Sequence, residues 1–254
     1  MRFESVGKTD VGLRRAHNED SYLIVEDQQL YIVADGMGGH NSGEVASMLA
    51  VETVAGFFDE TQGDDDVTWP FRPDRGIAWQ NNRFATAVKL ANLRIYETAQ
   101  RNEGQRGMGT TFVGLHFYRN DAIIAHVGDS RVYRFRNNDL VQLTEDHSLL
   151  NDYLRTHDLT PEEIENFPRK NVILRALGMK DSVQVDVMED AWQVGDIYLV
   201  VSDGLNAMCT DAEVETLMRQ HLPDLEATAD VLINAANDAG GVDNCTVILI
   251  RVTE

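Results

Sequence analysis

Three times along this chain, an apolar run leads into an aspartate that lies beside a very small residue. The segments are 32–36 (IVADG), 125–130 (AHVGDS) and 200–204 (VVSDG), and a fourth aspartate, Asp243, lies just before the apolar run 246–252. A strand end is a rigid mount for a side chain, and a glycine there lets the backbone turn sharply. The recurrence therefore constrains the fold, because it predicts several strands whose ends carry carboxylates.

Carboxylates gathered at one edge of a sheet repel each other strongly. Two like charges about 4 Å apart cost roughly 4 kcal/mol at an effective dielectric near 20. A divalent cation removes that cost, and ligands that are all oxygen favour Mg²⁺ or Mn²⁺ over Zn²⁺. A single Asp-Gly pair is more often only a turn. The metal hypothesis therefore depends on the repetition and on a fold that brings the aspartates together.

Short apolar runs predict antiparallel strands, with helices in separate blocks. The predicted strands are 22–25, 30–34, 111–117, 122–127, 131–135, 197–201 and 246–252. Apolar stripes with helical spacing occupy 46–57, 84–95, 214–218 and 225–236. Residues 137–139 (NND) are turn-like and predict a hairpin that continues into 140–143. Strands and helices do not alternate strictly, which favours an α+β layered fold over a parallel one.

The balance of charge excludes some classes of function. Lys plus Arg is 22 and Asp plus Glu is 42 among 254 residues, so the formal net charge is −20. A chain this acidic is a poor match for nucleic-acid phosphates or for anionic lipid, so we expect neither nucleic acid nor membrane as a partner. No run approaches the roughly 18 apolar residues of a membrane span.

The two cysteines and the first residues of the chain indicate a compartment. Cys209 and Cys245 are far apart and form no C-x-x-C pair, and although one disulfide is possible by count, reduced core thiols are the expectation. The opening sequence, MRFESVGKTDVG, lacks the apolar stretch of a secretory signal. We therefore expect a cytoplasmic protein.

Two polar segments interrupt the pattern. Residues 61–76 hold three consecutive aspartates and two prolines and are predicted to form a solvated loop. Residues 146–171 are predicted to leave the sheet as a small helical excursion. Within them Thr160 is a helix cap, Pro161 takes the first helical position and Glu163 completes a capping box.

Two short motifs lie near the first aspartate. The stretch 35–40 (DGMGGH) precedes a predicted helix, whose first amides could cradle a phosphate, but it also fits a plain turn. The stretch 14–20 (RRAHNED) places two arginines beside two acids. Beside a metal cluster an arginine fork would clamp a phosphate, whereas elsewhere it would form a surface ion pair.

At these motifs the sequence resembles the PPM family of Mg²⁺/Mn²⁺-dependent serine/threonine protein phosphatases, in its bacterial branch. The matching blocks run in order along almost the whole chain. They are 15–21, 33–40 with 43–44, 108–111, 125–133, 143–148, 172–178, 202–205 and 243–246. The resemblance implies a four-layer α-β-β-α sandwich, two antiparallel sheets flanked by helices, as one domain over 1–254. Residues 146–171 match the flap that borders the cleft in bacterial members.

The resemblance also implies a binuclear metal centre at one end of the sandwich. Asp35 would bridge both ions, and the carbonyl of Gly36 would bind one of them. Asp203 and Asp243 would bind the other ion. Asp129, together with Asp203, would hold a third and weaker ion.

The remaining site residues follow from the same resemblance. Asp20 and Glu19 would lie at the edge of the centre and act mostly through metal-bound waters. Arg15 matches the phosphate-binding arginine. His40 would be the proton donor. Animal members carry a candidate histidine directly after the Asp-Gly pair, where this chain has Met37, so a metal-bound water is the alternative donor.

The function implied is hydrolysis of phosphoserine and phosphothreonine in proteins by a water that bridges two Mg²⁺ or Mn²⁺ ions. The expected partners are phosphorylated proteins, including a Ser/Thr kinase and its substrates, and a monomer is expected. A non-catalytic phosphoprotein-binding relative is the alternative from another class. A third interpretation leaves the carboxylates as acidic turns, in which case Mn²⁺ would not raise the thermal stability.

Overall fold

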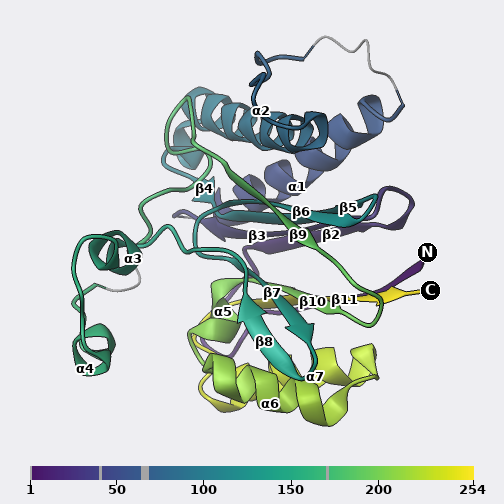
Figure 1. The fold of residues 1–254 in the computed structure, drawn as a ribbon. Helices are drawn as coiled ribbons and strands as arrows, with labels where there is room; N and C mark the ends of the chain where they lie inside the picture. The colour runs from purple at the N-terminus through teal and green to yellow at the C-terminus, as the bar shows by residue number, and fades with distance from the viewer. Residues whose placement is uncertain (1, 40–41, 64–68, 170–171) are drawn as a thin grey trace.

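Two antiparallel sheets stacked face to face form the centre of the structure (Figure 1). The structure is a computed structural model that describes residues 2–39, 42–63, 69–169 and 172–254. One sheet has the strand order β1-β11-β10-β7-β8. The other has the order β2-β3-β5-β6-β9, with the short β4 paired to β3. Neighbouring strands in both sheets run antiparallel.

Where an apolar run predicted a strand, the observed bounds agree with it to within a few residues. The first sheet contains β1 (Arg2–Asp10), β7 (Arg131–Arg136), β8 (Asp139–Gln142), β10 (Ile197–Val201) and β11 (Cys245–Thr253). The second contains β2 (Asp20–Val25), β3 (Leu30–Met37), β4 (Gly109–Thr110), β5 (Phe112–Tyr118), β6 (Asp121–Val127) and β9 (Asp186–Ala191). Short 3-10 turns follow β2 (Glu26–Gln28) and precede β4 (Glu103–Gln105).

Helices cover both outer faces of the stacked sheets. The helices α1 (Ser42–Glu60) and α2 (Trp79–Arg101) lie on the second sheet, and α5 (Asp203–Asn206), α6 (Asp211–His221) and α7 (Leu225–Asp238) lie on the first. Three apolar clusters fill the spaces between the layers, one under each helical layer and one between the sheets. The predicted α+β class and four-layer α-β-β-α sandwich are therefore confirmed.

Three strands were not predicted, namely the two-residue β4 and two strands at sheet edges. β1 and β9 are the end strands in their sheets. Their sequences, RFESVGKTD and DVMEDA, carry charges throughout and contain no continuous apolar run. An edge strand keeps one backbone edge toward solvent and tolerates charge, which also protects against edge-to-edge association. The apolar-run criterion therefore could not find them.

The described part of the polar segment, residues 146–169, contains two short helices that project from one end of the sandwich, α3 (Leu149–Leu154) and α4 (Pro161–Glu165) (Figure 1). The predicted capping box is present, because the Thr160 hydroxyl accepts from the Glu163 amide and the Glu163 carboxylate accepts from the Thr160 amide. This confirms the sequence signal for the start of α4.

The loop after α1 is described only in part, and Asp64, Asp65 and Asp66 lie outside the described residues. Beyond them, the Trp69 ring packs 5.3 Å from the Trp79 ring, between centroids. Among the described residues, no helix has both the length and the apolar character that crossing a bilayer requires.

Candidate metal centre

Asp20 and Asp35 come together because they are cross-strand partners at the start of β2 and the end of β3. The backbone of Asp35 is held on its other side by Thr111. The Thr111 amide donates to the Asp35 carbonyl at 2.8 Å, and the Asp35 amide donates to Thr111 Oγ1 at 3.0 Å. Thr111 Oγ1 also lies 2.7 Å from Oγ of Ser130, the neighbour of Asp129. This short network thereby fixes the positions of three candidate ligands, Asp20, Asp35 and Asp129.

Asp203 and Asp243 reach the same region from the first sheet. Asp203 begins α5 just after β10, and Asp243 lies just before β11; since β10 and β11 are antiparallel neighbours, these two ends meet at one edge. A side chain at Gly204 has no room, because its Cβ would lie 2.0 Å from the Asn244 carbonyl oxygen. The glycine after Asp203 thus permits the close approach of α5 and β11.

The side chain of Asp20 connects the two sheets. Its Oδ2 accepts hydrogen bonds from Ser202 Oγ at 2.8 Å and from Thr246 Oγ1 at 2.6 Å. These hydroxyl residues belong to the segments that carry Asp203 and Asp243. Asp20 is therefore held between the sheets, beside the segments that carry Asp203 and Asp243.

The pKa values of the carboxyl groups are raised by burial and by one another. Burial is the largest cause at each. The pKa of Asp35 is raised well above its usual value, with the charges of Asp20, Asp203 and Asp243 adding to the burial effect. The pKa values of Asp20 and Asp129 rise to about 7, and that of Asp203 also rises. These four carboxyl groups thus share one poorly solvated region, as the sequence predicts for a cation site.

Unpartnered oxygen atoms show what this region can bind. Oδ1 of Asp20, of Asp129 and of Asp203 is buried and has no hydrogen-bond donor among the described residues. Buried carboxylate oxygens without donors are costly unless a cation satisfies them. The set consists of oxygen ligands only, which fits Mg²⁺ or Mn²⁺.

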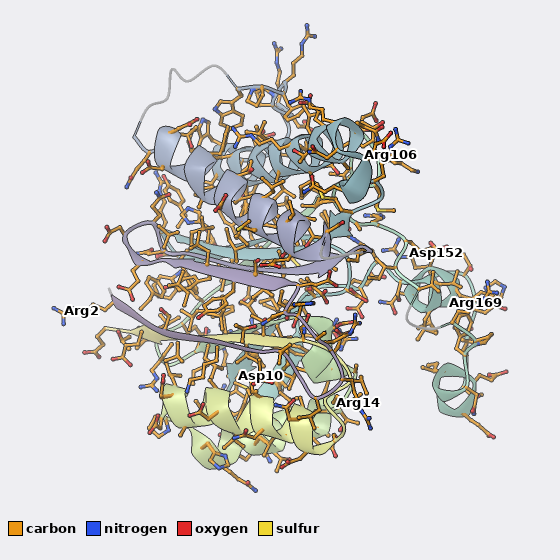
Figure 2. The ribbon with its side chains drawn as sticks, turned by 180° about the vertical axis from the view of Figure 1, so that it is seen from behind. Arg2, Asp10, Arg14, Arg106, Asp152 and Arg169 are labelled. Atoms are coloured by element: carbon orange, nitrogen blue, oxygen red, sulfur yellow. The ribbon has the colours of Figure 1, made fainter. Side chains whose placement is uncertain are left out.

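Arg15 lies at this centre, with its Nη2 atom 2.6 Å from Oδ2 of Asp243. The Arg15 side chain is 47% exposed, so the guanidinium is open to solvent on one side. The loop that carries it is anchored where the amides of Leu13 and Arg14 donate to the Gly241 carbonyl. Figure 2 shows Arg14 at the same end of the molecule as Asp152 and Arg169 of the helical excursion.

Gly36 and Glu19 lie against the first turn of α1. The Gly36 amide donates to the Glu19 carbonyl at 3.1 Å. A Cβ on Gly36 would lie 2.2 Å from the Gly43 carbonyl oxygen, and a Cβ on Gly43 would lie 2.6 Å from Glu19 Oε1. Glycine is thus required at both positions. His40, the predicted proton donor, lies outside the described residues.

A second group of potential ligands consists of His126, His147 and Asp186. The Gly128 amide donates to His147 Nδ1 at 3.0 Å, so the ring proton is on Nε2, which faces Asp186 Oδ2 at 3.1 Å. Arg175 Nη1 donates to the other Asp186 oxygen at 2.9 Å. The position a metal would take is therefore filled by a proton and a guanidinium, and this group is an ion-pair network.

Sequence reasoning missed the residues that hold the carboxylates in place. Asn244 Oδ1 accepts from the Glu19 amide at 2.8 Å, and its Nδ2 donates to the carbonyls of Val11 and His17. It thereby attaches the Arg15 loop to the start of β11. The available signal was the hydroxyl or amide residue beside three of the aspartates, namely Ser202, Ser130 and Asn244.

Comparison with known proteins identifies the family. The sequence profile described as protein phosphatase 2C matches residues 13–239. The chain belongs to the protein phosphatase 2C family. This match includes Arg15 and four of the five clustered aspartates, and Asp243 follows just beyond it.

Relatives in the protein phosphatase 2C family match over nearly their whole length. The serine/threonine phosphatase Stp of Listeria welshimeri is 39% identical over 96% of this chain and 94% of its own. The protein phosphatase PhpP of Streptococcus pneumoniae is 38% identical over 97% and 96%.

Solved structures of similar proteins have the same fold. The serine/threonine phosphatase PstP/Ppp of Mycobacterium tuberculosis superposes with a TM-score of 0.87 at 31% identity over 100% of both chains. The catalytic domain of PstP, solved in complex with two manganese ions, gives 0.83 at 31% identity over 99% of both.

Proposed function

We propose that this centre hydrolyses phosphoserine and phosphothreonine in proteins and that it depends on Mg²⁺ or Mn²⁺. Membership of the protein phosphatase 2C family makes the chain a metal-dependent protein phosphatase. The observation that carries the residue-level proposal is the set of buried, unpartnered carboxylate oxygens supplied by separate strand ends. Asp35, Asp203, Asp243 and the Gly36 carbonyl would hold two ions, and Asp129 with Asp203 would hold a third.

When bound, the ions would lower the pKa of a water and stabilise negative charge on the phosphoryl group. The protein supplies the rest of the chemistry. Arg15 binds two phosphoryl oxygens through its planar fork and holds phosphorus in line for attack. Its contact with Asp243 keeps the guanidinium at the rim of the centre. Ser202 and Thr246 keep Asp20 oriented, and Glu19 and Asp20 would position waters at the edge.

Departure of the serine or threonine oxygen requires a proton. We propose His40 as its donor, with water as the alternative. We also propose that the chain is one catalytic domain over 1–254 and that the flap, residues 146–171, borders the substrate cleft. The position of this segment at the same end as Arg14 supports that assignment.

The direct test is turnover of p-nitrophenyl phosphate and of phosphoserine, phosphothreonine and phosphotyrosine peptides. We expect turnover in Mn²⁺ that EDTA abolishes and that added Mn²⁺ restores, with phosphotyrosine the poorest peptide. Binding of the phosphoserine peptide at saturating Mn²⁺ without any turnover would instead favour the phosphoprotein-binding alternative.

We propose that the substrates include a Ser/Thr protein kinase and proteins that it phosphorylates, and that the enzyme acts as a cytoplasmic monomer. The free thiols of the buried Cys209 and Cys245 fit a reducing compartment. Light scattering of the purified protein and phosphoproteomics of cells that lack it test these statements.

A further inference from the structure

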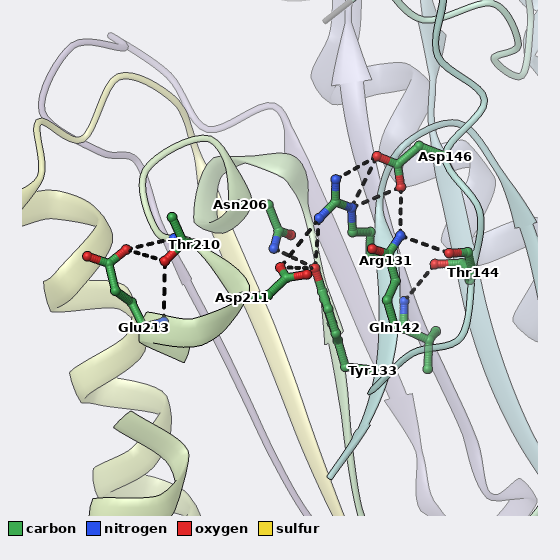
Figure 3. Close-up of polar contacts among 10 residues, drawn as sticks. Arg131, Tyr133, Gln142, Thr144, Asp146, Asn206, Thr210, Asp211 and Glu213 are labelled. Carbon is green, nitrogen blue, oxygen red and sulfur yellow. Dashed lines mark hydrogen bonds and ion pairs between the residues drawn. The ribbon is translucent and has the colours of Figure 1, made fainter. Parts of the chain in front are cut away.

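A buried tyrosine hydroxyl lies where two ligand-bearing segments meet (Figure 3). Tyr133 is on β7 and is 1% exposed. Its hydroxyl accepts hydrogen bonds from Arg131 Nη1 at 2.8 Å and Asn206 Nδ2 at 2.7 Å, and it donates to Asp211 Oδ1 at 2.9 Å. One donor and two acceptor sites are all that a phenol offers, so its hydrogen-bonding capacity is fully used.

The bond between Tyr133 and Asn206 connects the segments that carry Asp129 and Asp203. β7 begins two residues after Asp129, and Asn206 ends α5, the single turn that begins at Asp203. A helix of one turn has too few hydrogen bonds to hold its own position. The placement of α5, and with it that of Asp203, therefore depends on contacts such as this one.

The Tyr133 hydroxyl also restrains the guanidinium of Arg131. Arg131 Nε and Nη2 donate to Asp146 at 2.9 and 2.7 Å, while Nη1 donates to Tyr133 (Figure 3). These contacts direct the guanidinium toward Asp146, although Arg131 lies only two residues from Asp129 along the chain. Without the hydroxyl, Nη1 keeps only a long contact of 3.7 Å to Asp211 Oδ1 and is freer to turn toward the carboxylates, where a positive charge competes with a metal ion.

We propose that Tyr133 is a positioning residue whose hydroxyl sets the relative placement of Asp129 and Asp203 and holds Arg131 away from them. It thereby determines how tightly the ion between these two aspartates binds. The inference rests on the proposed function, which assigns an ion to that position. It adds a residue that touches neither ion nor substrate.

Tyr198 offers a matched control in the same sheet. It is a fully buried tyrosine on β10, and its hydroxyl donates to Asp190 Oδ2 at 2.6 Å. Arg134 donates to the other oxygen of Asp190. Tyr198→Phe therefore removes a hydroxyl from a similar Tyr-Asp-Arg set that has no hydrogen bond to α5.

The experiment measures Mn²⁺ binding to the full chain by electron paramagnetic resonance of the free ion. Wild type, Tyr133→Phe, Tyr198→Phe, Asn206→Ala and the double variant Tyr133→Phe/Asn206→Ala are compared. We expect Tyr133→Phe to keep the tighter ions and to weaken the weakest one about tenfold, the effect of roughly one hydrogen bond. Tyr198→Phe should leave the isotherm unchanged. The double variant should bind the weakest ion less tightly than Asn206→Ala, because only the loss of the Tyr133 hydroxyl also releases Arg131.

The outcomes separate this inference from the function on which it rests. A wild type that binds no Mn²⁺ contradicts the proposed function itself. If wild type binds Mn²⁺ and Tyr133→Phe has the same isotherm as wild type, only the positioning role is overturned. Equal weakening of Mn²⁺ binding by Tyr133→Phe and Tyr198→Phe would overturn it too. If Tyr133→Phe does not fold, Asn206→Ala still removes the bond between Tyr133 and α5, and it should by itself weaken the weakest ion while the tighter ions stay bound.

Discussion

Ser202 Oγ donates to Asp20 Oδ2 at 2.8 Å, so a residue that follows a strand of one sheet orients a carboxylate of the other. The two residues are 182 positions apart in the sequence. Thr246 adds a second donor to the same oxygen. The acidic cluster is therefore assembled by the stacking of the sheets, and its charge acts on the stability of the whole sandwich.

The stability of the metal-free protein should fall as pH rises. The folded-state pKa of Asp20 and of Asp129 is about 7, above the unfolded value near 4. Between pH 4 and pH 7 the folded state holds protons that the unfolded state has lost. The contribution of these two groups to the free energy of unfolding is therefore fully present below about pH 4 and is lost by about pH 7. In EDTA, the melting temperature should drop by about 3 °C or more from pH 5 to pH 7.5.

Two comparisons make that result specific to the cluster. Asp20→Asn should flatten the decline, because it removes one of the groups responsible. Saturating Mn²⁺ should raise the melting temperature more at pH 7.5 than at pH 5, because protons compete with the ion. A metal-free melting temperature that is flat or rises over this range would contradict the pKa assignment.

Asp203→Asn should separate catalysis from folding. The substitution removes a charge from a group of like charges, so the metal-free variant should melt no lower than wild type at pH 7.5. Its turnover of p-nitrophenyl phosphate in Mn²⁺ should fall at least about 100-fold, because stabilisation of several kcal/mol is lost. Asp238→Asn, an exposed carboxylate on α7, is the control and should change neither quantity. Wild-type turnover by Asp203→Asn would refute the ligand assignment.

Arg15→Ala should weaken the binding of the phosphate substrate without weakening the binding of Mn²⁺. The guanidinium bonds to Asp243 in the metal-free protein, so its removal frees a ligand and Mn²⁺ should bind at least as tightly as in wild type. The KM for p-nitrophenyl phosphate should rise about tenfold, and Arg15→Lys should recover only part of it, since an ammonium lacks the planar fork. Weaker Mn²⁺ binding with an unchanged KM would show that Arg15 supports the ions instead.

A pair of glycine variants tests the close packing beside Asp203. At Gly204 an added Cβ would lie 2.0 Å from a backbone oxygen, so Gly204→Ala should displace α5, lower the melting temperature and weaken Mn²⁺ binding. Gly56 is an exposed position in α1 with no atom within 4 Å of an added Cβ. Gly56→Ala should stabilise the protein by about 1 kcal/mol through helix propensity. Thermal melts of both variants, with and without Mn²⁺, give the comparison, and a neutral Gly204→Ala would contradict the packing.

Much of the fold could be predicted from local patterns. The strands β3, β6, β10 and β11 are continuous apolar runs, because they are buried on both faces of their sheets. The helix α7 shows the apolar stripe of its buried face. The edge strands β1 and β9 lack that signal because solvent accepts their charges.

The candidate site, too, could be predicted only in part from the sequence. The aspartates were visible because strand, aspartate and small residue recur, and the family resemblance then supplied their roles. The supporting bonds were not visible, because Ser202 to Asp20 and Asn206 to Tyr133 join residues far apart in sequence. Which hydroxyl reaches which carboxylate is decided by the stacking of the sheets, which no local pattern encodes.

The central claim is that folding brings carboxylates from separate strands into one cage for divalent ions. Anomalous diffraction at the manganese edge, from crystals grown in Mn²⁺, tests it most directly. We predict two strong peaks among Asp35, the Gly36 carbonyl, Asp203 and Asp243, with a weaker third peak between Asp129 and Asp203. Peaks only at His126, His147 and Asp186, or none near the aspartates, would contradict the account.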